Sequence, residues 1–231
     1  MDRFVYIHGF NSDGNSRSGR ELAQLLGVSV VCPEYDYAKP FASCLASIRR
    51  QILESVDTEK DRLTVMGSSL GGFFALQLRH PAIVHAVAWN PVVFPAIQLE
   101  QFLGQNTRFG DGVEWEFTRE TLLSYAQAPD PRPWQNAIWA CELRATAKEG
   151  PMSFSMSGPC EEVTPADSPV RPANVPRRDI FLGDNDELLD ARLTRAFWQG
   201  CAELHDIISG HQIMDYGHAI TLLKQGKCLA G

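Results

Sequence analysis

Two adjacent serines between glycines are the residues of this chain whose types and spacing point most directly to chemistry. They lie in the stretch 66-MGSSLGGFF-74, where Gly67-Ser68-Ser69-Leu70-Gly71 fits the pattern G-x-S-x-G. This pattern marks a sharp turn that presents its central serine as a nucleophile, and the register selects Ser69, with Ser68 as its neighbour. The chemistry would be acyl transfer through a covalent intermediate. A glycine and serine cluster between apolar runs is also typical of an ordinary turn, so the interpretation depends on the flanking elements.

The segments on either side of the turn are those that a nucleophilic serine requires. Residues 63–66 are a short apolar run typical of a buried strand, and residues 72–79 predict a helix that ends before Pro81. The serine hydroxyl would therefore lie at the N-terminus of a helix, whose dipole favours developing negative charge. The same turn offers the backbone N–H of Leu70 as a donor to an oxyanion.

Strand-length apolar runs alternate with helical patterns along most of the chain. The predicted strands are residues 4–7, 28–32, 63–66, 84–89, 179–182 and 204–208. A helix is predicted over residues 18–26, with Ser18-x-x-Glu21 as a capping box and Gly27 as the stop. Further helices are predicted from the residue after Pro40 to Val56, over residues 72–79 and 187–199, and around Ile213, Ile220 and Leu223. This alternation predicts an α/β fold with a mostly parallel central sheet of about six strands and helices on both faces.

The segment from Pro95 to Pro176 interrupts the alternation. Residues 118–127 predict a helix capped by Thr118, but nine of the fourteen prolines lie from Pro129 to Pro176. So long an irregular stretch is typical of a lid, a binding loop or a disordered segment. We predict a single domain over residues 1–231, with residues 95–176 inserted as a lid or cap. The order and role of residues 130–176 stay open.

Composition narrows the classes of partner and compartment. The chain has 231 residues and a formal net charge of −7, with no basic run, which argues against nucleic acid or an anionic membrane surface as a partner. No apolar stretch approaches the roughly 20 residues of a membrane span, and no signal peptide is visible. Six scattered cysteines without a CxxC pair favour reduced thiols in the cytoplasm. We expect no cofactor and no metal, and the oligomeric state is left open.

Several motifs together resemble a known family. The first strand followed by 8-HGFNSD-13, then 66-MGSSLGGFFA-75, 90-NP-91 and 102-FLGQN-106, is similar to the YqiA/UPF0227 group of small bacterial esterases in the α/β-hydrolase superfamily. The resemblance covers residues 1 to about 127 and resumes from about 179, whereas the proline-rich middle does not match. It implies an α/β-hydrolase fold and esterase or thioesterase activity on acyl substrates.

The resemblance also implies roles for the loop after the first strand. The backbone N–H of Phe10 is expected to be the second oxyanion donor beside that of Leu70. His8 is expected to brace this loop rather than to catalyse. Asn11 and Ser68 are expected to contact substrate, with Ser12 and Asp13 near the mouth of the site, although turn chemistry alone would explain residues 11–13.

The acid and the base should follow late strands, because the chain order in this fold is serine, acid, histidine. Four carboxylates compete after residues 179–182, namely Asp184, Asp186, Glu187 and Asp190. The family pattern G-x-x-D-x-L-L selects Asp186, with Asp184 as the alternative, and at least two of the four are expected only to cap a helix. For the base we favour His211, directly after a strand and a glycine, over His218 in the last helix. His80, His85 and His205 are expected to be structural.

These residues predict a serine hydrolase that cleaves small-molecule esters or thioesters with Ser69, His211 and Asp186. Aromatic residues of the interrupting segment could form an acyl pocket or could simply pack it onto the sheet; they are Phe94, Phe102, Phe109, Trp115, Phe117, Trp134, Trp139 and Phe154. Two alternatives stay open: a catalytically idle hydrolase fold that serves as a binding or scaffold protein, and a triad enzyme acting on peptide or C–C bonds.

Overall fold

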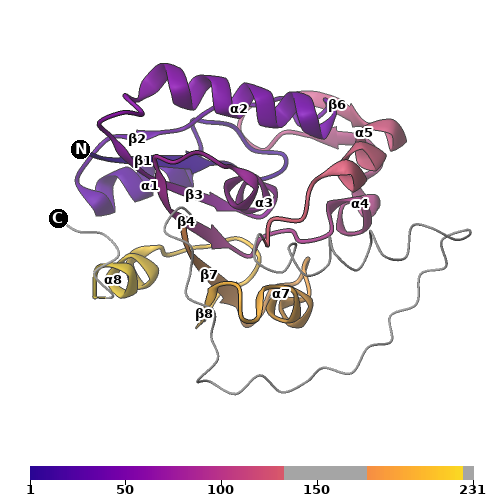
Figure 1. The fold of residues 1–231 in the computed structure, drawn as a ribbon. Coiled ribbons are helices and arrows are strands. Elements are labelled where there is room, and N and C mark those ends of the chain that lie inside the picture. Colours follow the sequence, from indigo (N-terminus) through magenta and orange to yellow (C-terminus); the bar gives the residue numbers. More distant parts are fainter. Residues whose placement is uncertain (133–175, 226–231) are drawn as a thin grey trace, which may run out of the picture. The chain divides into compact units, whose positions relative to one another are not determined.

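A six-stranded parallel sheet forms the centre of the molecule (Figure 1). The computed structural model describes residues 1–132 and 176–225. The strands are β1 (Asp2–Ile7), β2 (Val30–Val31), β3 (Arg62–Ser68), β4 (Ile83–Trp89), β7 (Arg177–Gly183) and β8 (Glu203–Ile207). Their order is β2-β1-β3-β4-β7-β8, and each adjacent pair is parallel. All six predicted strands are confirmed, although β2 is shorter than predicted.

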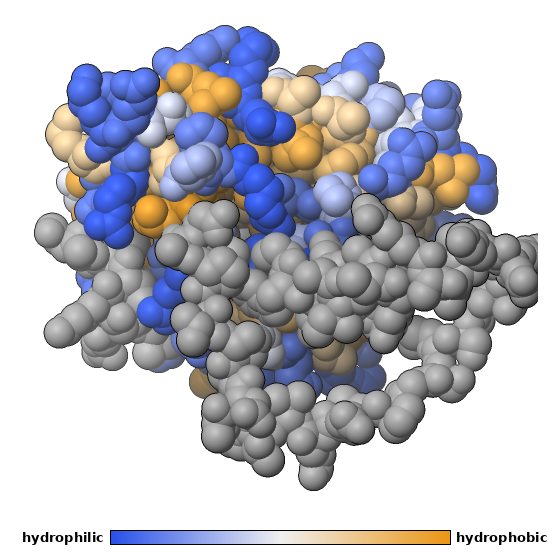
Figure 2. Space-filling model, viewed as in Figure 1, coloured by the Kyte–Doolittle hydropathy of each residue, from blue (hydrophilic) through white to orange (hydrophobic). Residues whose placement is uncertain are grey.

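Alternate residues of the strands face two separate cores. The long helices are α1 (Arg17–Leu26), α2 (Phe41–Ser55), α3 (Leu70–Gln77), α7 (Ala191–Trp198) and α8 (Gly217–Gln225). In β1, Val5 and Ile7 belong to the core that α2 and α3 cover, whereas Phe4 and Tyr6 belong to the core on the other face, under α1 and α8. Helices on both faces of a parallel sheet are therefore confirmed, since each face needs an apolar cover. On the outer surface over α2, hydrophilic side chains are interspersed with apolar ones (Figure 2).

The boundaries of the first helix correct one prediction. The capping residue of α1 is Ser16, whose side chain accepts a hydrogen bond from the Gly19 N–H, so the predicted capping box of Ser18 and Glu21 is wrong. Ser18 lies inside the helix, where its hydroxyl accepts a bond from Tyr216 instead. The stop is as predicted, because Gly27 has a φ of 72° that favours glycine.

The later helices begin further along the chain than their apolar patterns predict. Helix α7 starts at Ala191, with Asp190 as its capping residue, so residues 187–190 belong to the loop before it. Helix α8 starts at Gly217, which leaves Ile213 in the preceding loop. Among the residues that the structure describes, no helix is long and apolar enough to cross a membrane.

The described part of the interrupting segment is built from short elements. These are α4 (Pro95–Gln98), a 3-10 turn (Glu100–Phe102), an antiparallel hairpin of β5 (Gly104–Thr107) and β6 (Glu114–Phe117), α5 (Arg119–Ser124) and a second 3-10 turn (Tyr125–Gln127). The predicted helix with Thr118 as its cap is confirmed. The described residues up to 131 and from 176 belong to one compact unit. Residues 133–175 lie outside the described residues, so the lid stays a prediction.

Candidate active site

The turn between β3 and α3 holds Ser69 in a strained conformation at the carboxyl end of the sheet. Ser69 has φ 52° and ψ −122°, a combination that a residue with a side chain rarely adopts. A Cβ atom at Gly67 would collide with the backbone of Gly71, and one at Gly71 would collide with the backbone of Ile7. The two glycines of the motif are therefore required by close backbone approach, as the pattern predicts.

The structure brings the three predicted triad residues together. The Nε2 atom of His211 lies 3.0 Å from Ser69 Oγ, and its Nδ1 lies 3.0 Å and 3.1 Å from the two carboxylate oxygens of Asp186. The Asp186 side chain is 2% exposed and that of His211 is 16% exposed. Hydroxyl, imidazole and carboxylate thus form one chain of hydrogen bonds, with the hydroxyl end open to a cavity.

The loop after β7 gives each of its four carboxylates a different partner. Asp186 Oδ1 also accepts the N–H groups of Leu188 and Leu189, which orient it toward the imidazole. The alternative acid, Asp184, accepts the Ser209 N–H instead, and Asp190 caps α7. The fourth, Glu187, accepts the backbone N–H of His211 at 2.9 Å. That hydrogen bond lowers the pKa of Glu187, so the group is charged at neutral pH.

The remaining histidines lie elsewhere. His218 is on the exposed face of α8, and His80 accepts the Ala82 N–H. His85 and His205 both bond to the buried carboxylate of Asp179 in the interior of the sheet. Geometry therefore favours His211 as the partner of Ser69, in agreement with the position inferred from the sequence.

The loop after β1 lies directly against the nucleophile. A Cβ at Gly9 would lie 3.3 Å from Ser68 O and 3.4 Å from Ser69 Cβ, so this loop is in van der Waals contact with the turn that carries the nucleophile. His8 is 1% exposed, stacks on Tyr35 with ring centroids 4.4 Å apart, and is bonded through Nδ1 to Gly9 O at 3.0 Å. The Tyr35 hydroxyl donates to His8 O. His8 therefore braces the loop that carries the Phe10 N–H.

Asn11 connects this loop to the β5–β6 hairpin. It has a φ of 59°, its Oδ1 accepts the Trp115 Nε1–H at 2.8 Å, and its carbonyl accepts the Phe109 N–H. The Phe10 ring packs on Trp115 and Phe117 at centroid distances of 5.1 Å and 5.2 Å. Asn11 lines the cavity, and its predicted contact with substrate stays a prediction.

Sequence reasoning missed the role of Asn90, which ties together the segments that carry the acid and the base. Its Oδ1 accepts the Gly183 N–H at 2.7 Å, and its Nδ2 donates to Gly210 O at 2.9 Å and to His211 O at 3.3 Å. The side chain thus joins the end of β7, which leads to the acid, to the loop that carries the base. Asn90 is 3% exposed with a φ of 41°. An asparagine that follows a buried strand and precedes Pro91 was the available signal.

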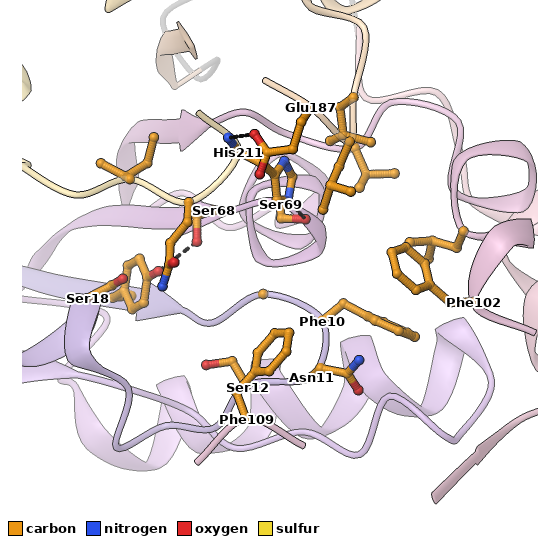
Figure 3. Close-up of a pocket in the computed structure, with 18 of the residues that line it drawn as sticks. Phe10, Asn11, Ser12, Ser18, Ser68, Ser69, Phe102, Phe109, Glu187 and His211 are labelled. Carbon is orange, nitrogen blue, oxygen red and sulfur yellow. Dashed lines mark hydrogen bonds between the residues drawn. The ribbon is translucent and has the colours of Figure 1, made fainter. Parts of the chain in front are cut away.

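A cavity of about 350 Å³ opens in front of Ser69. Figure 3 shows Ser69 and His211 between two different ends of this cavity, with Phe102 on one side and Ser18 and Ser68 on the other. The apolar end is lined by Val92, Leu99, Leu189 and Phe102, which belong to one hydrophobic cluster with Phe10. The opposite end is lined by the hydroxyl-bearing side chains of Tyr6, Ser18, Ser68 and Tyr216, with Ile213 packed beside the two tyrosines.

The aromatic residues of the interrupting segment divide between the two expected roles. Phe102 and Phe109 line the cavity, whereas Trp115 and Phe117 pack beneath the Phe10 ring and Phe94 packs on Phe197. Trp134, Trp139 and Phe154 lie outside the described residues. In the ranges that the structure describes, no group of three or more His, Cys, Asp or Glu side chains is arranged to hold a metal ion.

Comparison with known proteins shows the family and the fold. Residues 3–227 match the family described as Uncharacterised protein family (UPF0227), so the chain belongs to that family. Solved structures similar to it have the α/β-hydrolase fold, as the six-stranded parallel sheet indicates.

Three of these structures illustrate the likeness. A candidate hydrolase from Agrobacterium vitis S4 has a TM-score of 0.63 at 13% identity, over 98% of this chain and 87% of the other. Est1E from Butyrivibrio proteoclasticus has a TM-score of 0.61 at 12% identity, over 99% and 87%. S-formylglutathione hydrolase from Staphylococcus aureus has a TM-score of 0.57 at 15% identity, over 98% and 83%. At such identities the likeness establishes the fold, and the chemistry must be argued from the site.

Proposed function

We propose that this protein is a serine hydrolase that cleaves carboxylic ester or thioester bonds through an acyl-enzyme intermediate on Ser69. The observation that carries the proposal is the hydrogen-bonded series from Ser69 Oγ to His211 Nε2 at 3.0 Å and from His211 Nδ1 to Asp186 at 3.0 Å. An idle fold has no need of a strained serine with a partnered base beside an open cavity. The esterase and hydrolase names of the similar structures support the same class.

In the proposed mechanism His211 acts first as a base and then as an acid. It accepts the Ser69 proton as the hydroxyl oxygen attacks the substrate carbonyl. Asp186 keeps the Nδ1 atom protonated, orients the ring and stabilises the imidazolium that forms. His211 then donates the proton to the departing alcohol or thiol, and a water molecule activated by the same ring releases the acid from Ser69.

The negative charge that develops on the substrate oxygen is stabilised by two backbone donors in this proposal. Leu70 N is at the first turn of α3, and Phe10 N is on the loop that contacts Ser69. Among the described residues, neither N–H donates a hydrogen bond to another protein group. Such donors typically contribute about 2.7–4 kcal/mol each to transition-state stabilisation.

The apolar end of the cavity is assigned to the acyl chain. Val92, Leu99 and Phe102 offer hydrocarbon and aromatic surface, and apolar groups leave water for such surface at about 25 cal/mol per Å². The rate with nitrophenyl esters should therefore rise from acetyl toward butanoyl or hexanoyl. Equal rates from acetyl to octanoyl would contradict the acyl pocket. The insertion of residues 95–176 is proposed to complete this side of the site.

A fluorophosphonate probe tests the assignment directly. We expect covalent labelling of the wild-type protein, none of Ser69→Ala, and retained labelling of Ser68→Ala, which removes the adjacent hydroxyl of the same turn. Peptide mapping would locate the adduct on Ser69. A folded wild-type protein that is not labelled between pH 6 and 9 would overturn the proposal in favour of an idle binding protein. Labelling without turnover of esters or thioesters would instead favour action on another bond.

A further inference from the structure

We propose that the hydroxyl-lined end of the cavity binds the alcohol part of the substrate, and that the substrate is an oxygen ester of a neutral, hydroxyl-bearing alcohol such as a glycerol or sugar unit. This inference rests on the proposed function and specifies its substrate class. It is carried by the chemistry of four side chains beside Ser69, by the charges around the cavity and by the separation of the two cavity ends.

Four hydroxyl groups from different elements meet at this end, and we call them the hydroxyl cluster: Tyr6 of β1, Ser18 of α1, Ser68 at the end of β3, and Tyr216 before α8. The Tyr6 hydroxyl lies 2.7 Å from Ser68 Oγ, and the Tyr216 hydroxyl donates to Ser18 Oγ at 2.9 Å. Each hydroxyl can donate one hydrogen bond and accept two, so even if every donor is used within the cluster, where Tyr6 also interacts with Ser18 and Tyr216, lone pairs stay available to accept from the hydroxyls of a ligand.

The tyrosines of the cluster are fixed, while its serines reach the cavity. Tyr6 is 2% exposed and Tyr216 is 1% exposed, and the Tyr216 ring packs edge-on against Trp89 at 4.9 Å. Ser18 and Ser68 are both partly exposed. Burial raises the pKa of both tyrosines, so their phenols stay neutral at physiological pH. Rigid, neutral groups that both donate and accept suit the hydroxyls of a ligand, which also do both.

The charges around the cavity select against an anionic alcohol. Within the described chain, no Lys or Arg lines this cavity, and the acidic side chain among the lining residues is that of Glu187. The hydrogen bond from the His211 N–H lowers the pKa of Glu187, which keeps it negative. A phosphate or carboxylate on the alcohol would find no cation there and would be repelled by Glu187 and by the net charge of −7.

The two ends of the cavity fit an ester whose acyl part is apolar and whose alcohol part carries hydroxyl groups. Ser68 directly precedes the nucleophile, and Tyr216 follows the base by five residues in the same loop, so the hydroxyl cluster adjoins the groups that act on the departing oxygen. Figure 3 shows Ser18 and Ser68 across Ser69 from Phe102. With the acyl chain toward Phe102, the alcohol reaches the cluster.

Three esters of butyric acid test separately whether the site prefers an alcohol with hydroxyl groups and whether it rejects a charged one. They are ethyl butyrate, glyceryl monobutyrate, and glyceryl monobutyrate that carries a phosphate on its free terminal hydroxyl. Each kcat/KM is divided by the alkaline hydrolysis rate of that ester, which removes intrinsic reactivity. We expect the glyceryl ester to exceed the ethyl ester by about tenfold, since two added hydrogen bonds contribute roughly this much. The phosphate-bearing ester should be hydrolysed more slowly than the uncharged glyceryl ester.

Two variants then test the cluster itself. Ser18→Ala and Tyr216→Phe each remove one hydroxyl, and each should lower the glyceryl to ethyl ratio about threefold to tenfold. The ratio cancels any loss of catalysis that both esters share. Ser12→Ala, which removes a hydroxyl from another part of the cavity wall, should change the ratio less than twofold.

The outcomes distinguish this inference from the proposed function. Hydrolysis of all three esters without preference for the glyceryl ester, or a preference for the phosphate-bearing ester, would overturn the inference and leave the serine hydrolase standing. A glyceryl preference that survives both Ser18→Ala and Tyr216→Phe would overturn the role of the cluster. Absence of all ester hydrolysis together with absence of fluorophosphonate labelling would overturn both proposals.

Discussion

Two groups of histidine and aspartate lie on the same sheet, and they differ in what surrounds them. At the carboxyl ends of the strands, His211 contacts Asp186 through one ring nitrogen and Ser69 through the other. In the interior, Asp179 of β7 lies between His85 of β4 and His205 of β8, with a distance of 2.7 Å to each Nε2.

The interior carboxylate has no capacity left for catalysis. Arg177 Nε also donates to Asp179 at 2.7 Å, and Asp179 is 1% exposed. Neither His85 nor His205 contacts a hydroxyl nucleophile within the described chain, and none of the described cavities is lined by these groups. The same residue types therefore stabilise the sheet in one place and can perform chemistry in the other. What distinguishes them is a second ring nitrogen that faces an accessible hydroxyl.

The largest difference between the two groups should appear in activity. Ser69→Ala and His211→Ala should each lower kcat/KM for ester hydrolysis by about four orders of magnitude or more, because the triad acts as a unit. Thermal unfolding should change little, since both side chains lie at the surface of the cavity. His85→Ala provides the matched control in the interior group and should keep Ser69 reactive. If a folded His85→Ala protein lost as much activity as His211→Ala, the two groups of histidine and aspartate would not differ in function.

The interior group should instead govern stability. Asp179→Ala should lower the free energy of unfolding by about 2–3 kcal/mol, because it leaves the buried imidazole of His85 and that of His205 without their acceptor, while the 38% exposed Arg177 side chain can regain water. Urea unfolding measures this loss. Asp186→Ala, the matched change at the triad, also removes a buried acceptor of the Leu188 and Leu189 N–H groups, so it should lower both stability and activity, whereas Asp179→Ala should leave Ser69 reactive. If Asp179→Ala proved as stable as the wild type, the interior group would not have a structural role.

The pH dependence of stability follows from the same carboxylate. Burial alone would raise the pKa of Asp179, but the hydrogen bonds from His205, His85 and Arg177 outweigh it and hold that pKa well below its usual range. The stabilisation is therefore present above the unfolded-state pKa of about 4 and is lost as the pH falls from there toward the folded value. Unfolding free energies measured from pH 6 to pH 3 should fall in the wild type and fall less steeply in Asp179→Asn.

Local patterns explain why much of the fold could be predicted. Buried parallel strands read as short apolar runs, and the glycines at 67 and 71 are required by close backbone approach, so their spacing alone located Ser69. Gly27 and Thr118 mark helix ends through backbone conformation and capping, which are also local. The family pattern added Asp186, where the four neighbouring carboxylates left the choice open.

What the sequence did not reveal depends on contacts between distant segments. Asn90 bonds to residues more than 90 positions away, and no local pattern states that an amide side chain will join two loops. The capping residue of α1 is Ser16 rather than Ser18, because Ser18 pairs with Tyr216 nearly 200 positions further on. The division of the cavity into apolar and hydroxyl ends likewise requires the folded chain.

Asn90 affects the position of the triad rather than its chemistry, because its side chain bonds to the backbone of the segments that carry Asp186 and His211. Asn90→Gly removes the bonds to Gly183, Gly210 and His211 but tolerates the φ of 41°. We expect kcat to fall by about 10- to 100-fold, since displacement of catalytic groups by about 1 Å can cost that much, with a smaller change in KM. Asn90→Ala should be less stable than Asn90→Gly because of added backbone strain. An unchanged kcat in Asn90→Gly would exclude the positioning role.

The smallest expected effect belongs to Glu187, whose carboxylate accepts the backbone N–H of His211 and is exposed to solvent. Glu187→Gln keeps an acceptor for that N–H and removes only the charge. That charge favours the imidazolium form of His211 in the transition state, but water screens it, so kcat/KM should fall only about twofold to fivefold. The difference from wild type should shrink as the salt concentration rises from 0.05 M to 1 M.

Glu187→Ala also removes the acceptor and should lose more activity, by an amount that salt does not abolish. If the two variants lost the same activity at every salt concentration, the hydrogen bond to His211 would have no role separate from the charge of Glu187.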